Sequence, residues 1–199
     1  MRVKSEAKRQ AILDIAKATF IEQGYSNTSM SEIASRVGGS KATLYNYFSS
    51  KEDIFAAVME ASAADKIAHA FHLLEKNNDI RTTLIDFGMH YLHSILAPEI
   101  MAIRNMAINE ANRSDISRHF YENGPKKGWL LVCNYLKKQM SQEKLRIGDA
   151  WICAMHLRGL LEAEVVEPYA LGVLKQVDDQ QLEAVVKNNI SAFLRAYAI

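Results

Sequence analysis

The chain has 199 residues, of which 49% are hydrophobic and 24% are charged, and its formal net charge is +1. This composition can bury a core in one compact unit or in two small domains, and it excludes a low-complexity chain. The charge is distributed unevenly, because residues 1–52 hold eight Lys or Arg and five acids, a net +3 that leaves −2 for the rest. A basic end is a weak indication of a polyanionic partner.

The first predicted helix runs from about Ser5 to Gln23, with Gly24 as its terminator. Two shorter helices joined by a glycine turn are predicted between residues 28 and 51. Ser29 and Glu32 have the spacing of a capping box, in which each side chain satisfies a free N–H at a helix start. Gly38-Gly39 ends that helix, since glycine accepts the left-handed backbone that a helix end needs.

The second short helix begins at Ser40, an N-cap candidate, and Leu44 and Phe48 give it a buried side. Its outward side then carries Lys41, Thr43, Tyr45, Asn46 and Tyr47. These side chains can donate to phosphates and to base edges, and no carboxylate stands among them. The spacing predicts a helix-turn-helix, whose second helix lies in the major groove. A surface hairpin without DNA contacts is the plainer alternative.

Further helices are predicted at about 51–76, 80–96, 99–111 and 115–140, from 148 to just before Pro168, and from 179 onward. Gly124-Pro125 must kink or split the helix at 115–140, because proline removes a hydrogen bond and clashes with the preceding turn. With 3 Pro and 9 Gly in the chain, the expectation is an all-α protein of about nine helices.

The last two helices carry apolar residues at helical spacing and are the best candidates for a dimer interface. The candidate interface residues are Trp151, Met155, Gly159, Val186, Ile190 and Phe193. The alternative is that both stripes face the chain's own core. A homodimer is predicted, because a two-fold pair presents two reading helices to a palindrome, about 34–36 Å apart or a multiple of that.

The middle helices supply aromatic, sulfur-containing and polar groups of the kind that line pockets for small ligands. The candidate pocket residues are Phe87, His90, Tyr91, Met101, Arg104, Asn109, Phe120, Trp129, Cys133 and His156. Residues of these types at helical spacing also form ordinary core, and that alternative stays open.

Residues from about Lys8 to Asp65 resemble the N-terminal domain of TetR-type transcriptional regulators. The matching stretch is RQAILDIAKATFIEQGYSNTSMSEIASRVGGSKATLYNYFSSKEDIF. It has the family's long first helix ending in G-[FY], then T-x-x-x-I-A, G-V-S-x-x-x-[LI]-Y-x-[HY]-F and x-x-K-x-x-[LI]. It departs from that pattern at Gly39, where valine is usual, and this change could loosen the packing of the turn.

The resemblance implies a DNA-binding domain over residues 6–66, with its helix-turn-helix at 29–48, and a helical ligand-sensing and dimerisation domain over residues 67–199. It implies a regulator, most simply a repressor, that a small molecule releases from a palindromic operator. Lys41 and Asn46 would meet base edges, Tyr45 would meet bases or backbone, and Ser40, Thr43, Tyr47 and Lys51 would hold phosphates. The full set of expected DNA contacts is Ser29, Ser31, Ser40, Lys41, Ala42, Thr43, Tyr45, Asn46, Tyr47 and Lys51.

No catalytic or metal-binding signature accompanies this pattern. Cys133 and Cys153 lack C-x-x-C spacing, and the chain contains no G-x-G-x-x-G, P-loop or H-E-x-x-H. We expect no enzyme activity, no cofactor and no metal, and free thiols in a cytoplasmic protein without a leader or a membrane span. The rival class is an all-helical interaction module that uses the hairpin to dock a protein.

Overall fold

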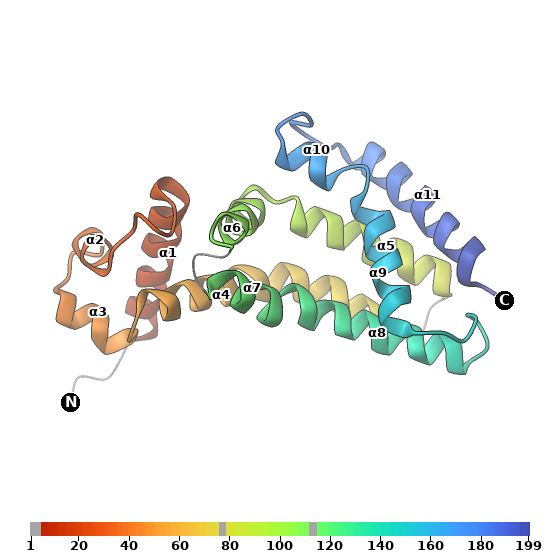
Figure 1. Ribbon diagram of the computed structural model, residues 1–199, viewed down its shortest axis with the longest axis horizontal. Helices are drawn as coiled ribbons and strands as arrows, with labels where there is room; N and C mark the ends of the chain where they lie inside the picture. Colours follow the sequence, from red (N-terminus) through yellow and green to blue (C-terminus); the bar gives the residue numbers. More distant parts are fainter. Residues whose placement is uncertain (1–4, 76–78, 112–114) are drawn as a thin grey trace. The chain divides into compact units, whose positions relative to one another are not determined.

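The computed structural model describes residues 5–75, 79–111 and 115–199, without the side chains of 62–68. These residues form eleven α-helices and one short 3-10 helix (Figure 1), which confirms the predicted all-α fold. Their contacts divide the chain into two units. Unit 1 is residues 1–62 with 102–124, and unit 2 is residues 63–101 with 125–199.

Unit 1 contains α1 (Glu6–Gln23), α2 (Met30–Arg36), α3 (Lys41–Tyr47), the first part of α4 (Lys51–His72), the last part of α6 (Pro98–Asn109) and α7 (Ile116–Asn123). Three aromatic rings stand in its core. Those of Phe20, Tyr25 and Phe55 lie 5.3–5.6 Å apart between centroids, in tilted and edge-to-face contacts that aromatic pairs favour. Buried Ile103 and Ile116 belong to the same apolar cluster, so the later chain portion is part of this core.

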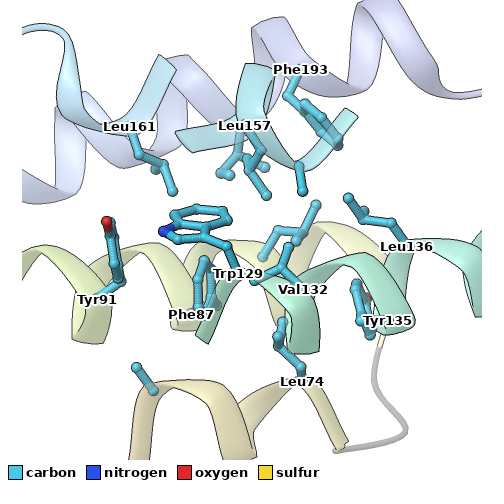
Figure 2. Close-up of a cluster of buried hydrophobic side chains, with 14 of the residues drawn as sticks. Leu74, Phe87, Tyr91, Trp129, Val132, Tyr135, Leu136, Leu157, Leu161 and Phe193 are labelled. Atoms are coloured by element: carbon cyan, nitrogen blue, oxygen red, sulfur yellow. The ribbon is translucent and has the colours of Figure 1, made fainter. Parts of the chain in front are cut away.

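Unit 2 contains the rest of α4, the 3-10 helix η1 (Leu73–Glu75), α5 (Ile80–Ile95), the start of α6, α8 (Pro125–Ser141), α9 (Ala150–Glu162), α10 (Val166–Ala170) and α11 (Asp179–Tyr197). Figure 2 shows Trp129 of α8 at the centre of its core, between Phe87 and Leu157. The Trp129 ring makes edge-to-face contacts with Phe87 at 5.8 Å and with Tyr91 at 5.2 Å.

Glycine allows the helices of unit 2 to approach closely. A Cβ added at Gly88 of α5 would lie 2.9 Å from Cγ1 of Val186 and 3.1 Å from Cδ2 of Leu161. At the first distance a neighbouring atom would have to move. The contact of α5 with α9 and α11 therefore depends on a residue without a side chain.

Helix boundaries follow the predicted start and stop signals in most places. Gly124-Pro125 splits the predicted helix at 115–140 into α7 and α8, and the carboxylate of Asp149 caps α9 by accepting from two backbone N–H groups. Asp178 caps α11 in the same way through the N–H of Gln181. The helix expected to end just before Pro168 ends at Glu162 instead, and a separate helix, α10, contains that proline.

The grouping of contacts differs from the single predicted division after residue 66. The first unit's leading portion ends nearby, at residue 62, but residues 102–124 join it as well. Burial of Ile103, Met106 and Ile116 in the unit 1 cluster accounts for this. Among the described helices, none combines the length and the apolar content that crossing a lipid bilayer would require.

Candidate nucleic-acid interface

Helix α2 is fixed by a cap, by an ion pair within the helix and by an ion pair to α1. The Ser29 hydroxyl accepts the backbone N–H of Glu32 at 3.2 Å, which forms one half of the predicted capping box. The Glu32 carboxylate instead accepts from Nε of Arg36 at 2.8 Å, and a second nitrogen of Arg36 donates to Glu22 of α1. Arg36 therefore ties α2 to α1 from the protein surface.

The turn between α2 and α3 depends on one glycine more than on the other. Gly38 has φ +69°, in the left-handed region that favours glycine, and its N–H donates to the carbonyl of Ser35. The carbonyl of Val37, near the end of α2, accepts from Nζ of Lys8. Gly39 lies outside the left-handed region, and a Cβ there would meet only Thr43, at 3.8 Å.

Helix α3 has a buried side and an open side, as predicted. Leu44 is 2% exposed, and Phe48, the C-cap, is 6% exposed. Lys41, Ala42, Tyr45 and Asn46 are exposed, and Thr43 and Tyr47 are half-buried. No acidic residue lies on α3, although Asp53 and Glu60 of α4 line the shallow depression beside Tyr45 and Asn46.

Some of the hydroxyls predicted to bind phosphate already have partners. Ser40 caps α3 by accepting the N–H of Thr43 at 3.1 Å, and the two side-chain hydroxyls lie 2.9 Å apart. The phenol oxygen of Tyr47 accepts the N–H of Ser5 at 3.2 Å. These contacts hold the rotation of both side chains next to the open side of α3.

Lys51, another predicted phosphate contact, is braced by the loop before α2. Its ammonium donates to the carbonyls of Tyr25 and Thr28, both at 2.9 Å, and lies 4.1 Å from the centre of the Tyr25 ring. Burial lowers the pKa of Lys51, and the charges of Glu52 and Glu110 oppose that shift. Two of its three N–H bonds are thus used within unit 1, and the phosphate role stays a prediction.

Sequence reasoning missed the polar groups around this loop. The Tyr25 hydroxyl donates to Glu52 at 2.8 Å, and burial together with that carboxylate raises the pKa of Tyr25. The Ser26 hydroxyl donates to Glu110 at 2.6 Å. These pairs span 27 and 84 residues, so no local spacing could have indicated them.

The ten candidate pocket residues are divided between the two units and between core and surface. Phe87, Tyr91, Trp129 and Cys133 lie in the core of unit 2, and buried Met101 also belongs to that unit. His90 and His156 are exposed, while Arg104, Asn109 and Phe120 belong to unit 1. The shared pocket stays a prediction. Helical spacing indicates burial without saying which cluster receives the side chain.

The sequence analysis did not predict that a carboxylate, Glu162, lies beside the aromatic core. The Tyr91 hydroxyl donates to Oε1 of Glu162 at 2.5 Å, and Nε of Arg158 donates to the same oxygen at 2.8 Å. Burial, followed by the charge of Glu162, raises the pKa of Tyr91. The spacing of four between Arg158 and Glu162 on α9 is the one sequence signal that could have found this pair.

The candidate dimer residues separate into two groups. Val186, Ile190 and Phe193 of α11 are each 0% exposed within unit 2, so a partner subunit could not touch them, and their assignment to an interface is corrected. On α9, Gly159 is exposed, and Trp151 and Met155 are half-buried. Both cysteines are free and buried, and burial raises the pKa of each thiol.

Among the described residues, no group of three or more His, Cys, Asp or Glu side chains could hold a metal ion. The chemistry of the α3 surface is that of hydrogen-bond donors, one cation and aromatic rings on a rigid helix. Such a surface can bind a polyanion and distinguish base edges.

Comparison with protein families gives two matches. Residues 12–58 match the model described as bacterial regulatory proteins, tetR family. Residues 82–199 match the model described as AefR-like transcriptional repressor, C-terminal domain.

The chain is also similar to individual proteins. It is 32% identical over 83 residues to the transcriptional activator FasR of Mycolicibacterium smegmatis, and 39% identical over 66 residues to the regulator AcrR of Shigella flexneri. These matches cover 42% and 32% of this chain, and only 38% and 31% of the two relatives.

Several solved structures match almost the whole chain. A TetR-family transcriptional regulator from Mesorhizobium loti has a TM-score of 0.85 at 26% identity, over 98% of this chain and 100% of that one. The flavonoid-responsive regulator FrrA has a TM-score of 0.79 at 28% identity, over 98% of each chain.

The two turn glycines should respond oppositely to alanine. Gly39→Ala should raise the free energy of unfolding by about 0.4–1 kcal/mol, because the added methyl meets no clash and restricts the unfolded chain. Gly38→Ala should lower it by about 1–2 kcal/mol, because φ is +69° there. Urea unfolding of the two variants measures both changes, and a loss of stability in both would contradict this description of the turn.

Proposed function

The chain belongs to the tetR family of bacterial regulatory proteins, a family of transcriptional regulators rather than enzymes. On that premise we propose that it is a repressor that binds a palindromic operator as a homodimer. In this proposal the repressor leaves the operator when a small molecule binds. The observation that carries the proposal is the open side of α3. It presents Lys41, Tyr45 and Asn46 together, exposed and free of acidic neighbours on the same helix.

Each exposed group on α3 has a distinct task in this proposal. Asn46 and Lys41 have the donor geometry to read base edges in the major groove, and Ala42 is small enough to approach a thymine methyl. Tyr45 is 49% exposed and would lie against bases or backbone. The Ser40, Thr43 and Tyr47 hydroxyls would contact phosphates, with Ser29 and Ser31 at the edge of the same surface.

Lys51 fits a double role. Its ammonium has three N–H bonds, and two of them donate to the carbonyls of Tyr25 and Thr28. The third would donate to a phosphate. A lysine fixed in this way loses little side-chain entropy when DNA binds, and that favours it as a positioning contact over a freely moving one.

The exposed face of α9 supports a homodimer. Ile152, His156, Gly159 and Ala163 are all exposed and follow one another at spacings of four, three and four, as one stripe along the helix. Ile152 is 52% exposed, and nothing lies within 4 Å of a Cβ added at Gly159. A glycine in such a stripe allows a second copy to pack closely. The buried α11 residues would act behind this surface, as core.

The aromatic core of unit 2 supports a planar aromatic effector that carries hydroxyl groups. Phe87, Tyr91 and Trp129 supply ring faces, and the carboxylate of Glu162 is an acceptor beside them with a side-chain exposure of 15%. FrrA, similar over the whole chain, is named as flavonoid-responsive. Because Trp129 is 1% exposed, such a ligand must separate the rings, and its preference for the separated state would shift the protein away from DNA.

Selection of bound sequences from random duplex DNA should return a palindrome. Asn46→Ala should then relax the preference at one base pair of each half-site, by about 1–3 kcal/mol, because the amide that pairs with a base edge is gone. Titration of matched duplexes measures this loss, and Asn134→Ala, at an exposed position of α8, is the control. Failure of the unaltered protein to bind any duplex at low ionic strength would leave the interaction-module alternative standing.

Gly159→Arg should convert the dimer to a monomer. The monomer has room for the new side chain, so folding should be kept, whereas an unpaired charge in a close interface should raise the dissociation constant more than about tenfold. Gel filtration with light scattering measures the mass, with Asn134→Arg on α8 as the control. If Gly159→Arg stays dimeric at micromolar concentration, the α9 stripe is not the interface.

Apigenin, a planar trihydroxyflavone, should release the operator duplex, and palmitate should not, because a flavone hydroxyl can donate to the Glu162 carboxylate, whereas the ionised headgroup of a fatty acid has no proton to donate. Tyr91→Phe should keep DNA binding and lower the apigenin concentration for half release about tenfold, because the hydrogen bond that Tyr91 donates to Glu162 stabilises the unliganded arrangement of the rings. Duplex retardation with increasing ligand measures both effects. Equal release by palmitate would contradict this effector chemistry.

A further inference from the structure

Glu110 is a buried carboxylate next to the helix-turn-helix. It directly follows α6 and is 5% exposed, and its Oε1 accepts the Ser26 hydroxyl at 2.6 Å. A carboxylate withdrawn from water is costly unless hydrogen bonds and opposite charges surround it. Glu110 and its partner Ser26 are 84 residues apart in the sequence. This buried carboxylate therefore joins two distant segments of unit 1.

The segment it holds is the loop between α1 and α2. Lys51 donates to the carbonyls of Tyr25 and Thr28, and Glu52 accepts the Tyr25 hydroxyl. The Thr28 hydroxyl closes the loop on the carbonyl of Gly24. The next residue is Ser29, the N-cap of α2. Any shift of this loop therefore moves the start of α2 and the acceptors of Lys51 together.

The charge of Glu110 acts on the same loop. It favours the charged form of Lys51, where burial works against it, and it disfavours ionisation of the Tyr25 phenol. Glu52 acts in the same direction on both groups. Lys51 thus keeps a half-buried position because two carboxylates and two carbonyls offset the loss of water.

We propose that Glu110 is a positioning residue for DNA binding, whose carboxylate holds the 25–28 loop and thereby fixes both the start of α2 and the Lys51 ammonium for a phosphate. This inference rests on the proposed DNA-binding function. Through this contact, the segment that follows α6 would position the helix-turn-helix directly, since both belong to unit 1. Ile103, Met106 and Ile116 supply the apolar part of that hold.

Simple electrostatics predicts the opposite of this proposal. Removing a carboxylate near a DNA-binding surface lowers repulsion and should strengthen binding to every duplex. If Glu110 positions Lys51, its removal should weaken binding despite the favourable change in net charge. The sign of the effect therefore separates the two mechanisms.

The test compares Glu110→Ala, Glu110→Gln and Ser26→Ala in the full chain, with Asp115→Asn as the charge-matched control. Asp115 lies in the same portion of unit 1, its side chain is 94% exposed, and its pair with Arg118 spans 3.9 Å. The affinity for the selected operator duplex is measured at several salt concentrations, and circular dichroism during heating reports folding.

Glu110→Ala should weaken operator binding about tenfold and reduce the slope of log affinity against log salt by about one phosphate contact. Glu110→Gln should recover part of the affinity, because its amide oxygen still accepts from Ser26. Ser26→Ala should give an intermediate loss. Asp115→Asn should bind as well as the unaltered protein or better.

A second comparison distinguishes positioning from general loosening. In a Lys51→Ala background, adding Glu110→Ala should cause no further loss of salt slope, because the contact it positions is already absent. An unchanged affinity and slope in Glu110→Ala, or a lowered melting temperature with the slope intact, would overturn the inference while leaving DNA binding in place. No binding by the unaltered protein would instead overturn the proposed function itself.

Discussion

Burial of Leu44 and Phe48 is the constraint on which the candidate interface depends. Helix α3 has only seven residues, so two apolar anchors four positions apart fix its rotation about its own axis. Once that rotation is fixed, the side chains of Lys41, Tyr45 and Asn46 must point to solvent. The Ser40 cap and the left-handed backbone at Gly38 fix where the helix begins. The reading surface is therefore a consequence of core packing.

The loop before α2 adds a second, polar constraint to the first. Ordinary apolar packing holds α1 and α4 together through Phe20 and Phe55, and the Tyr25 ring contacts both. Around this loop, Lys51 and Glu110 replace the water that buried backbone and hydroxyl groups would otherwise need. Such networks have strict geometry, because an unmatched partner in them is costly. A network with fixed geometry would keep the loop before α2, and with it the helix-turn-helix, in one orientation.

Apolar residues of unit 2 lie on one buried and one exposed helix face. The side of α11 that carries Val186 and Phe193 is buried in the core, and Gly88 allows α5 to approach it. The side of α9 that carries Ile152 and Gly159 is left open. A fully buried stripe stabilises a subunit, whereas an exposed one has free energy to gain from association. In the proposed dimer, α9 would mediate assembly, whereas the neighbouring helix α11 contributes to folding.

The sequence by itself determined the local features: the caps at Ser29 and Ser40, the turn at Gly38, the split before Pro125 and the open side of α3. Each of these depends on residues at most four positions apart, so the pattern and the cause lie in the same stretch of chain. Only the tertiary structure decided that 102–124 joins unit 1, that Ser26 meets Glu110, and that the α11 stripe faces inward. Helical periodicity shows that one face of a helix is apolar, but the surface that covers this face is chosen by packing between distant segments, for which a single sequence carries no local signal.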